Sequence, residues 1–402
     1  MLLQKPAFLL FYHTRAAEAS FGEWLGVLWH GLSLDCTVAG YVTAFPVVVV
    51  LASFWIPLSQ RVWRIILTVY FSLIALVTAA IFAVDLNLYG YWGFRLDGSV
   101  LIYLADPGEA LASASWGEVL RQIIIMLVYA GAMIWSYRRI LRLFRVEPVS
   151  LRGRIVPTVA ALLIGGLTFL AIRGGVTVAT ANVSKVYFSS NMFLNHAATN
   201  PVFSFLSSVG DNENYAEAYP FFEEERRKTL FEELRGNRPG ADAGTPRLLR
   251  SDRPNVVLIL LESFGRTIMD ETVNGEPVMP NMQRFKREGV WFENFFANSF
   301  RTDRGQVAVL CGFPAQTTMS IMKLPRKSAT LPSLARSLGR EGYRSVFMYG
   351  GDLNFTNQAS FMYSTGWEEL IWQKDMQLDA PTSKWGYADD VVVDLFGDEV
   401  EA

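Results

Sequence analysis

Thr302 is the residue in this sequence that is best placed to act as a nucleophile. It lies in the segment SFRTDRGQVAVLCGFP, residues 299–314, before a stretch in which Val307, Leu310 and Cys311 recur at helical spacing. We therefore expect Thr302 at or near a helix N-terminus, where free backbone N–H groups and the positive end of the helix dipole suit a phosphate. A threonine hydroxyl is a poor nucleophile alone, so this chemistry requires a metal ion that lowers its pKa.

Glu262 is the candidate ligand for such a metal ion. It ends the run NVVLILLE, residues 255–262, whose β-branched and leucine residues are typical of a central parallel strand that is buried on both faces. The same residues allow a plainer interpretation, in which Glu262 is a salt-bridged strand terminus and Thr302 is an ordinary helix N-cap.

The residues that follow indicate alternating helices and strands. We predict helices over Pro280–Glu288, Thr330–Gly339 and Ala388–Phe396, and further strands over Val290–Ala297 and Ser345–Tyr349. Such alternation predicts a parallel α/β sheet. Ligands of these sheets bind at the carboxyl ends of the strands, which is where Glu262, Gly351 and Asp352 fall.

The first half of the chain is predicted to cross a membrane. Hydrophobic residues make up 51% of the sequence and charged residues 18%, which is too apolar for an average soluble domain. Four apolar stretches approach the roughly 20 residues that a spanning helix needs. They cover approximately residues 38–57, 65–84, 119–137 and 155–172.

The charges of the loops predict how these spans are oriented. Arginines concentrate in residues 59–64 and 136–154, so we expect these loops in the cytoplasm and the chain after Gly174 outside it. The formal net charge is −2 and no polybasic field is present, which argues against a nucleic-acid partner. Residues 1–12 are too short to span, and they suit either the tail of a missing first helix or a short interfacial segment.

We divide the chain into three parts on these grounds. They are a transmembrane domain over residues 1–183, an interfacial connector and linker over 184–254, and a soluble domain over 255–402. Within the connector, residues 184–206 are expected to lie on the membrane surface, with His196 in a capping or interfacial role. Residues 219–234 suit a solvated helix, and residues 237–254 are rich in Pro and Gly and suit a linker.

Four motifs taken together resemble the sulfatase and alkaline phosphatase superfamily. They are NVVLILLESF, MPNMQRFKREGVWFENFFANSFRTDRG, VLCGFPAQ and LPSLARSLGREGYRSVFMYGGD. More narrowly, the sequence resembles the lipoteichoic acid synthase-like membrane phosphotransferases. This resemblance implies a fold with an N-terminal multi-helix transmembrane domain and an α/β sulfatase-like domain outside the cytoplasm.

The resemblance assigns roles to particular residues. Glu262 matches the first metal ligand, and Thr302 matches the nucleophile that also contacts the metal. True sulfatases place a cysteine there that is converted to formylglycine, whereas Cys311 lies in the following helix. This favours phosphoryl chemistry. Gly351, Asp352 and Asn357 lie in the region that binds the headgroup in the family. The implied cofactor is Mn²⁺, with Mg²⁺ or Zn²⁺ as alternatives.

The catalytic domain is expected to be incomplete. The family completes its metal site with an Asp-His pair further along the chain, but no histidine follows His196 in this sequence. We therefore expect either a fragment of a longer gene product or a degenerate relative.

The function implied by the resemblance is that of a multi-pass enzyme of the cytoplasmic (inner) membrane. It would transfer the headgroup of a phosphatidylglycerol-like phospholipid to a hydroxyl of a glycan or polymer through a phosphorylated Thr302. The alternatives are a phosphoethanolamine transferase, a sulfatase-like hydrolase, or an inactive truncated membrane protein. Phosphoethanolamine transferases of this layout usually carry several disulfides, and the two distant cysteines, Cys36 and Cys311, weigh against that alternative.

Overall fold

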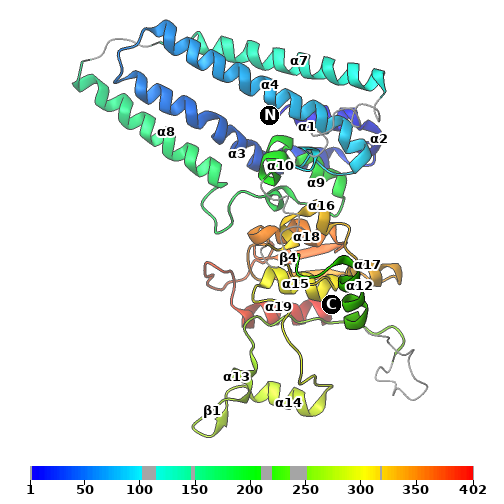
Figure 1. The fold of residues 1–402 in the computed structure, drawn as a ribbon. Helices are drawn as coiled ribbons and strands as arrows, with labels where there is room; N and C mark the ends of the chain where they lie inside the picture. Colours follow the sequence, from blue (N-terminus) through cyan, green and yellow to red (C-terminus); the bar gives the residue numbers. More distant parts are fainter. Residues whose placement is uncertain are drawn as a thin grey trace. The chain divides into compact units, whose positions relative to one another are not determined.

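The computed structural model describes residues 2–101, 115–145, 150–209, 220–235, 251–316 and 319–401. These residues are mostly helical (Figure 1). They form two compact units, of which the first combines Met1–Asn212 with Asp303–Ala402 and the second is Glu213–Thr302. Most of the expected linker over residues 237–254 lies outside the described residues.

Four long helices dominate the first unit. They are α3 (Phe21–Ser53), α4 (Gln60–Trp92), α7 (Trp116–Leu141) and α8 (Ile155–Arg173). Each is long and apolar enough to cross a membrane. Helix α4 packs along α7 and α3 packs along α8, as Figure 1 shows for the segments coloured blue to green. The four apolar spans expected from the sequence are therefore present as helices.

The helices extend beyond the apolar runs because polar capping residues set their ends. Ser20 and Ser115 are the N-caps of α3 and α7, and each begins a capping box. The serine hydroxyl accepts a hydrogen bond from the backbone N–H of Glu23 or Glu118, and the carboxylate of that glutamate accepts one from the backbone N–H of the serine. Helices α3 and α4 have 33 residues each, so they are about 50 Å long at the usual rise. This exceeds the roughly 30 Å hydrocarbon core, so α3 begins well before its apolar run and α4 extends beyond its run at both ends, whereas the run over residues 155–172 covers nearly all of α8.

Much of residues 184–206 packs inside the protein, and their expected place at the membrane surface stays a prediction. They contain η2 (Val183–Val186), α9 (Met192–Ala198) and most of α10 (Pro201–Ser208). All residues from Phe193 to Ala198 are buried. The polar residues suggested exposure, but Asn191, Asn195 and Asn200 instead accept hydrogen bonds from nearby backbone N–H groups. Such asparagines satisfy buried backbone donors, so the segment can be polar in sequence and still pack inside.

The N-terminal residues also pack against this segment. They form α1 (Gln4–Phe11) and α2 (His13–Ala16). Phe8 is fully buried, with its ring 4.8 Å from that of Tyr89 in an edge-to-face arrangement. Lys5 reaches Asp35 of α3 at 2.6 Å, and both side chains are buried. Gln4, Lys5, Phe8 and Leu9 of α1 thus form part of a core.

Residues 303–402 add a small α/β arrangement to the first unit. Strands β3 (Val346–Tyr349) and β4 (Glu369–Trp372) pair in parallel, with Val346 opposite Glu369. The helices and short turns around them are α15 (Thr302–Cys311), η3 (Ile321–Lys323), α16 (Pro325–Ser328), α17 (Leu334–Arg340), η4 (Phe355–Asn357), α18 (Gln358–Ser364) and α19 (Asp389–Glu401). The strand expected over Ser345–Tyr349 is present, whereas β4 was not foreseen.

The second unit contains only short elements among its described residues. They are α12 (Glu224–Arg235), α13 (Arg266–Asp270), the antiparallel pair β1 (Thr272–Val273) and β2 (Glu276–Pro277), and α14 (Pro280–Glu288). The helix expected over Pro280–Glu288 is confirmed, with proline in its first turn, where its missing N–H costs nothing.

Two expected strands are not formed. Residues 255–262 and 290–297 are assigned to no strand, and the side chains from Val256 to Leu261 are 42–64% exposed. The composition of both runs suits a strand that is buried on both faces, but a strand also needs a neighbour to accept and donate its backbone hydrogen bonds. Within the part of the chain that the structure describes, neither run has such a neighbour.

Candidate active site

Thr302 is the first residue of α15, as the spacing of apolar residues predicted. Its side chain is exposed, while the next residues, Asp303 and Arg304, are buried. Val307 and Leu310 on the same helix belong to the hydrophobic core of this region. The hydroxyl of Ser320 donates a hydrogen bond of 3.0 Å to the Asp303 carbonyl. Helix α15 is thus anchored along one side, and its N-terminus presents a hydroxyl to solvent.

Cys311 ends α15 and is a packing residue. It is 7% exposed and belongs to the same core as Leu310. Burial raises the pKa of its thiol to about 11. A buried thiol with a raised pKa is a poor nucleophile, so the position of Thr302 and not that of Cys311 suits chemistry on an incoming substrate.

Glu262 lies in an exposed turn that follows the extended run of residues 255–261. Ser263, the next residue, has a φ of 63°, and its carbonyl accepts a hydrogen bond of 3.0 Å from Gly265 N–H. A non-glycine residue in this left-handed region is uncommon and indicates a tight local turn. The turn places the Glu262 carboxylate in solvent.

The described residues do not complete a metal site. Glu262 and Thr302 would contribute two oxygen donors, whereas Zn²⁺ takes about four ligands and Mg²⁺ or Mn²⁺ about six. Across the parts of the chain that the structure describes, no group of three or more His, Cys, Asp or Glu side chains could hold an ion. We therefore derive no chemical step through a metal here.

Gly351 follows β3 and is needed for close packing. A Cβ atom at Gly351 would lie 2.5 Å from the Trp385 carbonyl oxygen, and one at Gly386 would lie 2.0 Å from the Gly350 carbonyl oxygen. The Gly350 carbonyl also accepts a hydrogen bond of 3.0 Å from Tyr387 N–H. Two backbone segments therefore cross in contact at the end of β3, which is a structural reason for glycine there.

Asp352 and Asn357 lie in the turn that follows. Asp352 Oδ1 accepts hydrogen bonds of 2.9 Å and 2.8 Å from Asn354 N–H and Nδ2. Thr356 and Asn357 have φ values of 54° and 65°. Two successive non-glycine residues in this region are strained by on the order of 1–3 kcal/mol each, which is common at ligand sites. Asn357 is 8% exposed, and its Oδ1 has no hydrogen-bond partner.

Two glutamines join the helix of Thr302 to the turn of Asn357. Gln306 of α15 donates a hydrogen bond of 3.4 Å from Nε2 to Gln358 Oε1 at the start of α18. Both side chains are buried, and Gln306 Oε1 has no partner. Sequence reasoning did not single out either glutamine. The pair lies 52 residues apart in the chain, and no local pattern indicates its proximity.

Lys185 is a cation near Asp352 that the sequence analysis also missed. It lies in η2, and burial lowers the pKa of its ammonium group, whereas the charge of Asp352 acts in the opposite direction. Two hydrogen bonds hold η2 against this region: Ser360 N–H donates to Ser184 Oγ at 3.0 Å, and Asn182 Nδ2 donates to the Asn354 carbonyl at 2.7 Å. The residues expected to bind a headgroup therefore lie beside the segment that leaves α8.

Comparisons with known proteins identify the class of this region. Residues 254–401 match the sulfatase family model. Phosphoglycerol transferase I of Xanthomonas campestris pv. campestris (strain B100) is 35% identical over 155 residues, covering 35% of this chain and 22% of that protein. Lipoteichoic acid synthase 1 of Bacillus subtilis (strain 168) is 31% identical over 130 residues, covering 29% and 19%. The matched segment thus spans about a fifth of each relative.

A solved structure is also similar in part. The crystal structure of a protein in the alkaline phosphatase superfamily from Vibrio parahaemolyticus is 29% identical and covers 30% of each chain, with a TM-score of 0.29.

The family model and the two relatives confirm the resemblance to sulfatase-superfamily enzymes. The region over residues 254–401 is sulfatase-like, and the chain is similar in part to a phosphoglycerol transferase and to a lipoteichoic acid synthase. It follows four helices of membrane-spanning length. The predicted fold class, a multi-helix membrane region followed by a sulfatase-like region, is therefore correct.

Proposed function

We propose that this protein is a membrane phosphotransferase that moves a phosphoglycerol-type headgroup from a phospholipid to a hydroxyl of a glycan or polymer. One observation carries the proposal: Thr302 is exposed at the N-terminus of α15, within the residues that match the sulfatase family model. The partial similarity of the chain to phosphoglycerol transferase I supports the choice of headgroup. The four membrane-length helices support a donor that stays in the bilayer.

The first half of the reaction is attack by Thr302 Oγ on the phosphodiester phosphorus of the lipid. The new bond joins Thr302 to the phosphoglycerol group, the bond to the diacylglycerol oxygen breaks, and diacylglycerol leaves with the proton that the hydroxyl releases. In the second half, an acceptor hydroxyl attacks the same phosphorus, and Thr302 recovers a proton. Charge develops on the phosphoryl oxygens in both halves, and the N-terminal N–H groups of α15 would stabilise it.

The headgroup would lie between α15 and the turn that contains Asp352 and Asn357. Gly351 would contribute by allowing the turn to pack against the Trp385 backbone, and the buried Asn357 Oδ1 would accept a hydrogen bond from a glycerol hydroxyl. Glu262 and Thr302 remain the proposed first ligands of a divalent metal ion, by resemblance Mn²⁺, which would supply charge neutralisation at phosphorus. The residues that complete such a site are not among those described.

We further propose that the protein lies in the cytoplasmic membrane with its sulfatase-like region outside the cytoplasm. The support is the arginine content of residues 59–64 and 136–154, which flank the helices on one side of the bundle.

Replacement of Thr302 tests the proposed nucleophile. In vesicles of phosphatidylglycerol, Thr302→Ala should lower diacylglycerol release by at least about a hundredfold, because the loss of a covalent nucleophile removes the intermediate. Thr330→Ala, at another exposed threonine, should leave release unchanged. Headgroup label that stays on the protein after acid quenching should map to the Thr302 peptide in the wild type only.

Other outcomes of the same assay decide between the alternatives. Release by Thr302→Ala at the wild-type rate would refute the nucleophile assignment. Turnover of phosphatidylethanolamine in preference to phosphatidylglycerol would favour the phosphoethanolamine transferase, and hydrolysis of an aryl sulfate would favour the hydrolase. No turnover by the wild type with any of these donors would favour a non-catalytic protein.

A further inference from the structure

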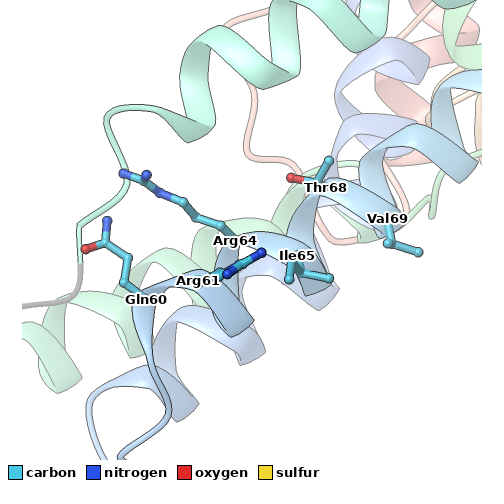
Figure 2. A pocket seen from close by; sticks show the side chains of 6 residues that line it. All are labelled: Gln60, Arg61, Arg64, Ile65, Thr68 and Val69. Carbon is cyan, nitrogen blue, oxygen red and sulfur yellow. The ribbon is translucent and has the colours of Figure 1, made fainter.

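A small pocket lies at the start of α4. It has a volume of about 490 Å³ and is lined by the side chains of one helix face: Gln60, Arg61, Arg64, Ile65, Thr68 and Val69. Figure 2 shows these side chains over successive turns of α4, with Gln60, Arg61 and Arg64 first and Ile65, Thr68 and Val69 further along. A cationic and hydrogen-bonding end thus precedes an apolar wall within the same pocket.

Part of the polar end is held in place by the end of α7. Gln60 Nε2 donates a hydrogen bond of 2.9 Å to the Phe144 carbonyl, and Arg64 Nη2 donates to the same carbonyl at 3.1 Å. These bonds satisfy a carbonyl beyond the C-terminus of α7, where the positive charge is also favourable. Arg64 Nε is nevertheless buried without a hydrogen-bond partner. One donor of a positioned guanidinium group is therefore left over.

The rest of the pocket is open to the surroundings of the bundle. Arg61 is exposed, and among the described residues no ion pair involves it. Ile65 and Val69 are 53% and 64% exposed, although they lie in a helix of membrane-spanning length. In a bilayer these two side chains contact lipid, and Arg61 lies about 6–12 Å further along the helix axis, toward its end.

We propose that this pocket binds an anionic phospholipid in the leaflet at this end of α4. The phosphate charge pairs with Arg61 and with the guanidinium charge of Arg64, the headgroup hydroxyls contact Gln60, and an acyl chain packs along Ile65 and Val69. Charge complementarity selects the occupant, because two guanidinium groups favour an anionic over a zwitterionic headgroup. By the charge of the loops this is the cytoplasmic leaflet, so the site is separate from the proposed donor site and independent of it.

Lipid retention by the purified full-length protein tests this site. Native mass spectrometry after equilibration with phosphatidylglycerol and phosphatidylcholine should show a retained phosphatidylglycerol in preference to phosphatidylcholine, in addition to any at the proposed donor site. Arg61→Gln should weaken that retention about fivefold, the effect of one arginine near an anionic lipid, and should leave phosphatidylcholine unchanged. Arg139→Gln is the matched control, because Arg139 is exposed near the same end of the bundle but does not line the pocket.

The outcomes distinguish specific lipid binding in this pocket from nonspecific attraction of anionic lipid to a basic surface. Equal retention by wild type and Arg61→Gln, or equal retention of both lipids, would overturn the proposal. Loss in Arg139→Gln as large as in Arg61→Gln would also overturn it, since attraction would then not depend on the pocket. Arg64→Gln removes the second cation but also the hydrogen bonds of Arg64 to the Arg142 and Phe144 carbonyls, so its thermal unfolding midpoint should be measured alongside.

Discussion

His196 is a buried imidazole that must stay neutral. It is 4% exposed, its Nδ1 lies 3.1 Å from the Tyr89 hydroxyl, and its Nε2 has no hydrogen-bond partner. Burial, and to a smaller extent the charge of Arg95, lower the pKa of His196 to about 3. The imidazole therefore has a structural role in the packing of α9 and does not exchange protons near neutral pH.

This shift predicts how stability depends on pH. Between the unfolded pKa of about 6.5 and the folded pKa of about 3, the unfolded chain binds more protons. The free energy of unfolding should therefore fall as the pH falls below 6.5, by about 2 kcal/mol from this residue at pH 5. Thermal unfolding in detergent at pH 7.5 and pH 5 measures it. His196→Gln should lose this contribution, and His13→Gln, at an exposed histidine, should keep it. Equal pH dependence in His196→Gln and wild type would contradict the assignment.

The residue types in the sequence were enough to nominate Thr302 and Glu262 but not their surroundings. A hydroxyl before a helical apolar pattern and a carboxylate after an apolar run are local features. Gln306, Gln358 and Lys185 acquire their place near Asn357 and Asp352 only through contacts across the fold, so no local pattern could reveal them.

Helix α1 packs closely against α3 around Gly31. A Cβ atom at Gly31 would lie 1.8 Å from Lys5 Cε and 2.8 Å from the Ala198 carbonyl oxygen. The glycine thus leaves room for Lys5 to pass and reach Asp35, which also accepts a hydrogen bond of 2.7 Å from Asn200 Nδ2. Because Gly31 has no side chain, α1, α3 and the start of α10 can pack around the buried ion pair of Lys5 and Asp35.

Gly31→Ala should therefore destabilise the protein by about 1–3 kcal/mol, because overpacking must displace Lys5 or the backbone of α9. The thermal unfolding midpoint in detergent should fall accordingly. Gly166→Ala in α8 is the matched control, since nothing lies within 4 Å of its added Cβ, and alanine there should be neutral or slightly stabilising. An unchanged midpoint in Gly31→Ala would mean that Lys5 does not occupy this position.

Helices and strands differed in how well the sequence predicted them. Helices α4, α8 and α14 were recognisable because each satisfies its own backbone hydrogen bonds and carries its pattern within one segment. The runs over residues 255–262 and 290–297 have strand composition but no paired strand, since a strand depends on a partner elsewhere in the chain. Strand β4 was not predicted, because only its pairing with β3 identifies it as a strand.

At the scale of the whole molecule, orientation in the membrane follows from charge and can be tested directly. In right-side-out membrane vesicles of a Cys36→Ser background, Lys228→Cys on α12 should react with an impermeant maleimide. Arg139→Cys should react only after permeabilisation. Both positions are exposed and Cys311 is buried, so labelling reports on sidedness. Reaction of Arg139→Cys in sealed vesicles, with Lys228→Cys protected, would reverse the proposed topology.

The sequence by itself determined the class of this protein: a set of apolar helices of spanning length, followed by a sulfatase-like region with a threonine at a helix start. These features are encoded locally, in hydropathy, capping residues and short motifs. Only the tertiary structure decided that residues 193–202 are buried, that Gly31 makes room for an ion pair, and that α15 contacts the turn of Asn357. Each of these depends on segments far apart in the chain, where contact is set by packing and hydrogen bonding and leaves no periodic trace in the sequence.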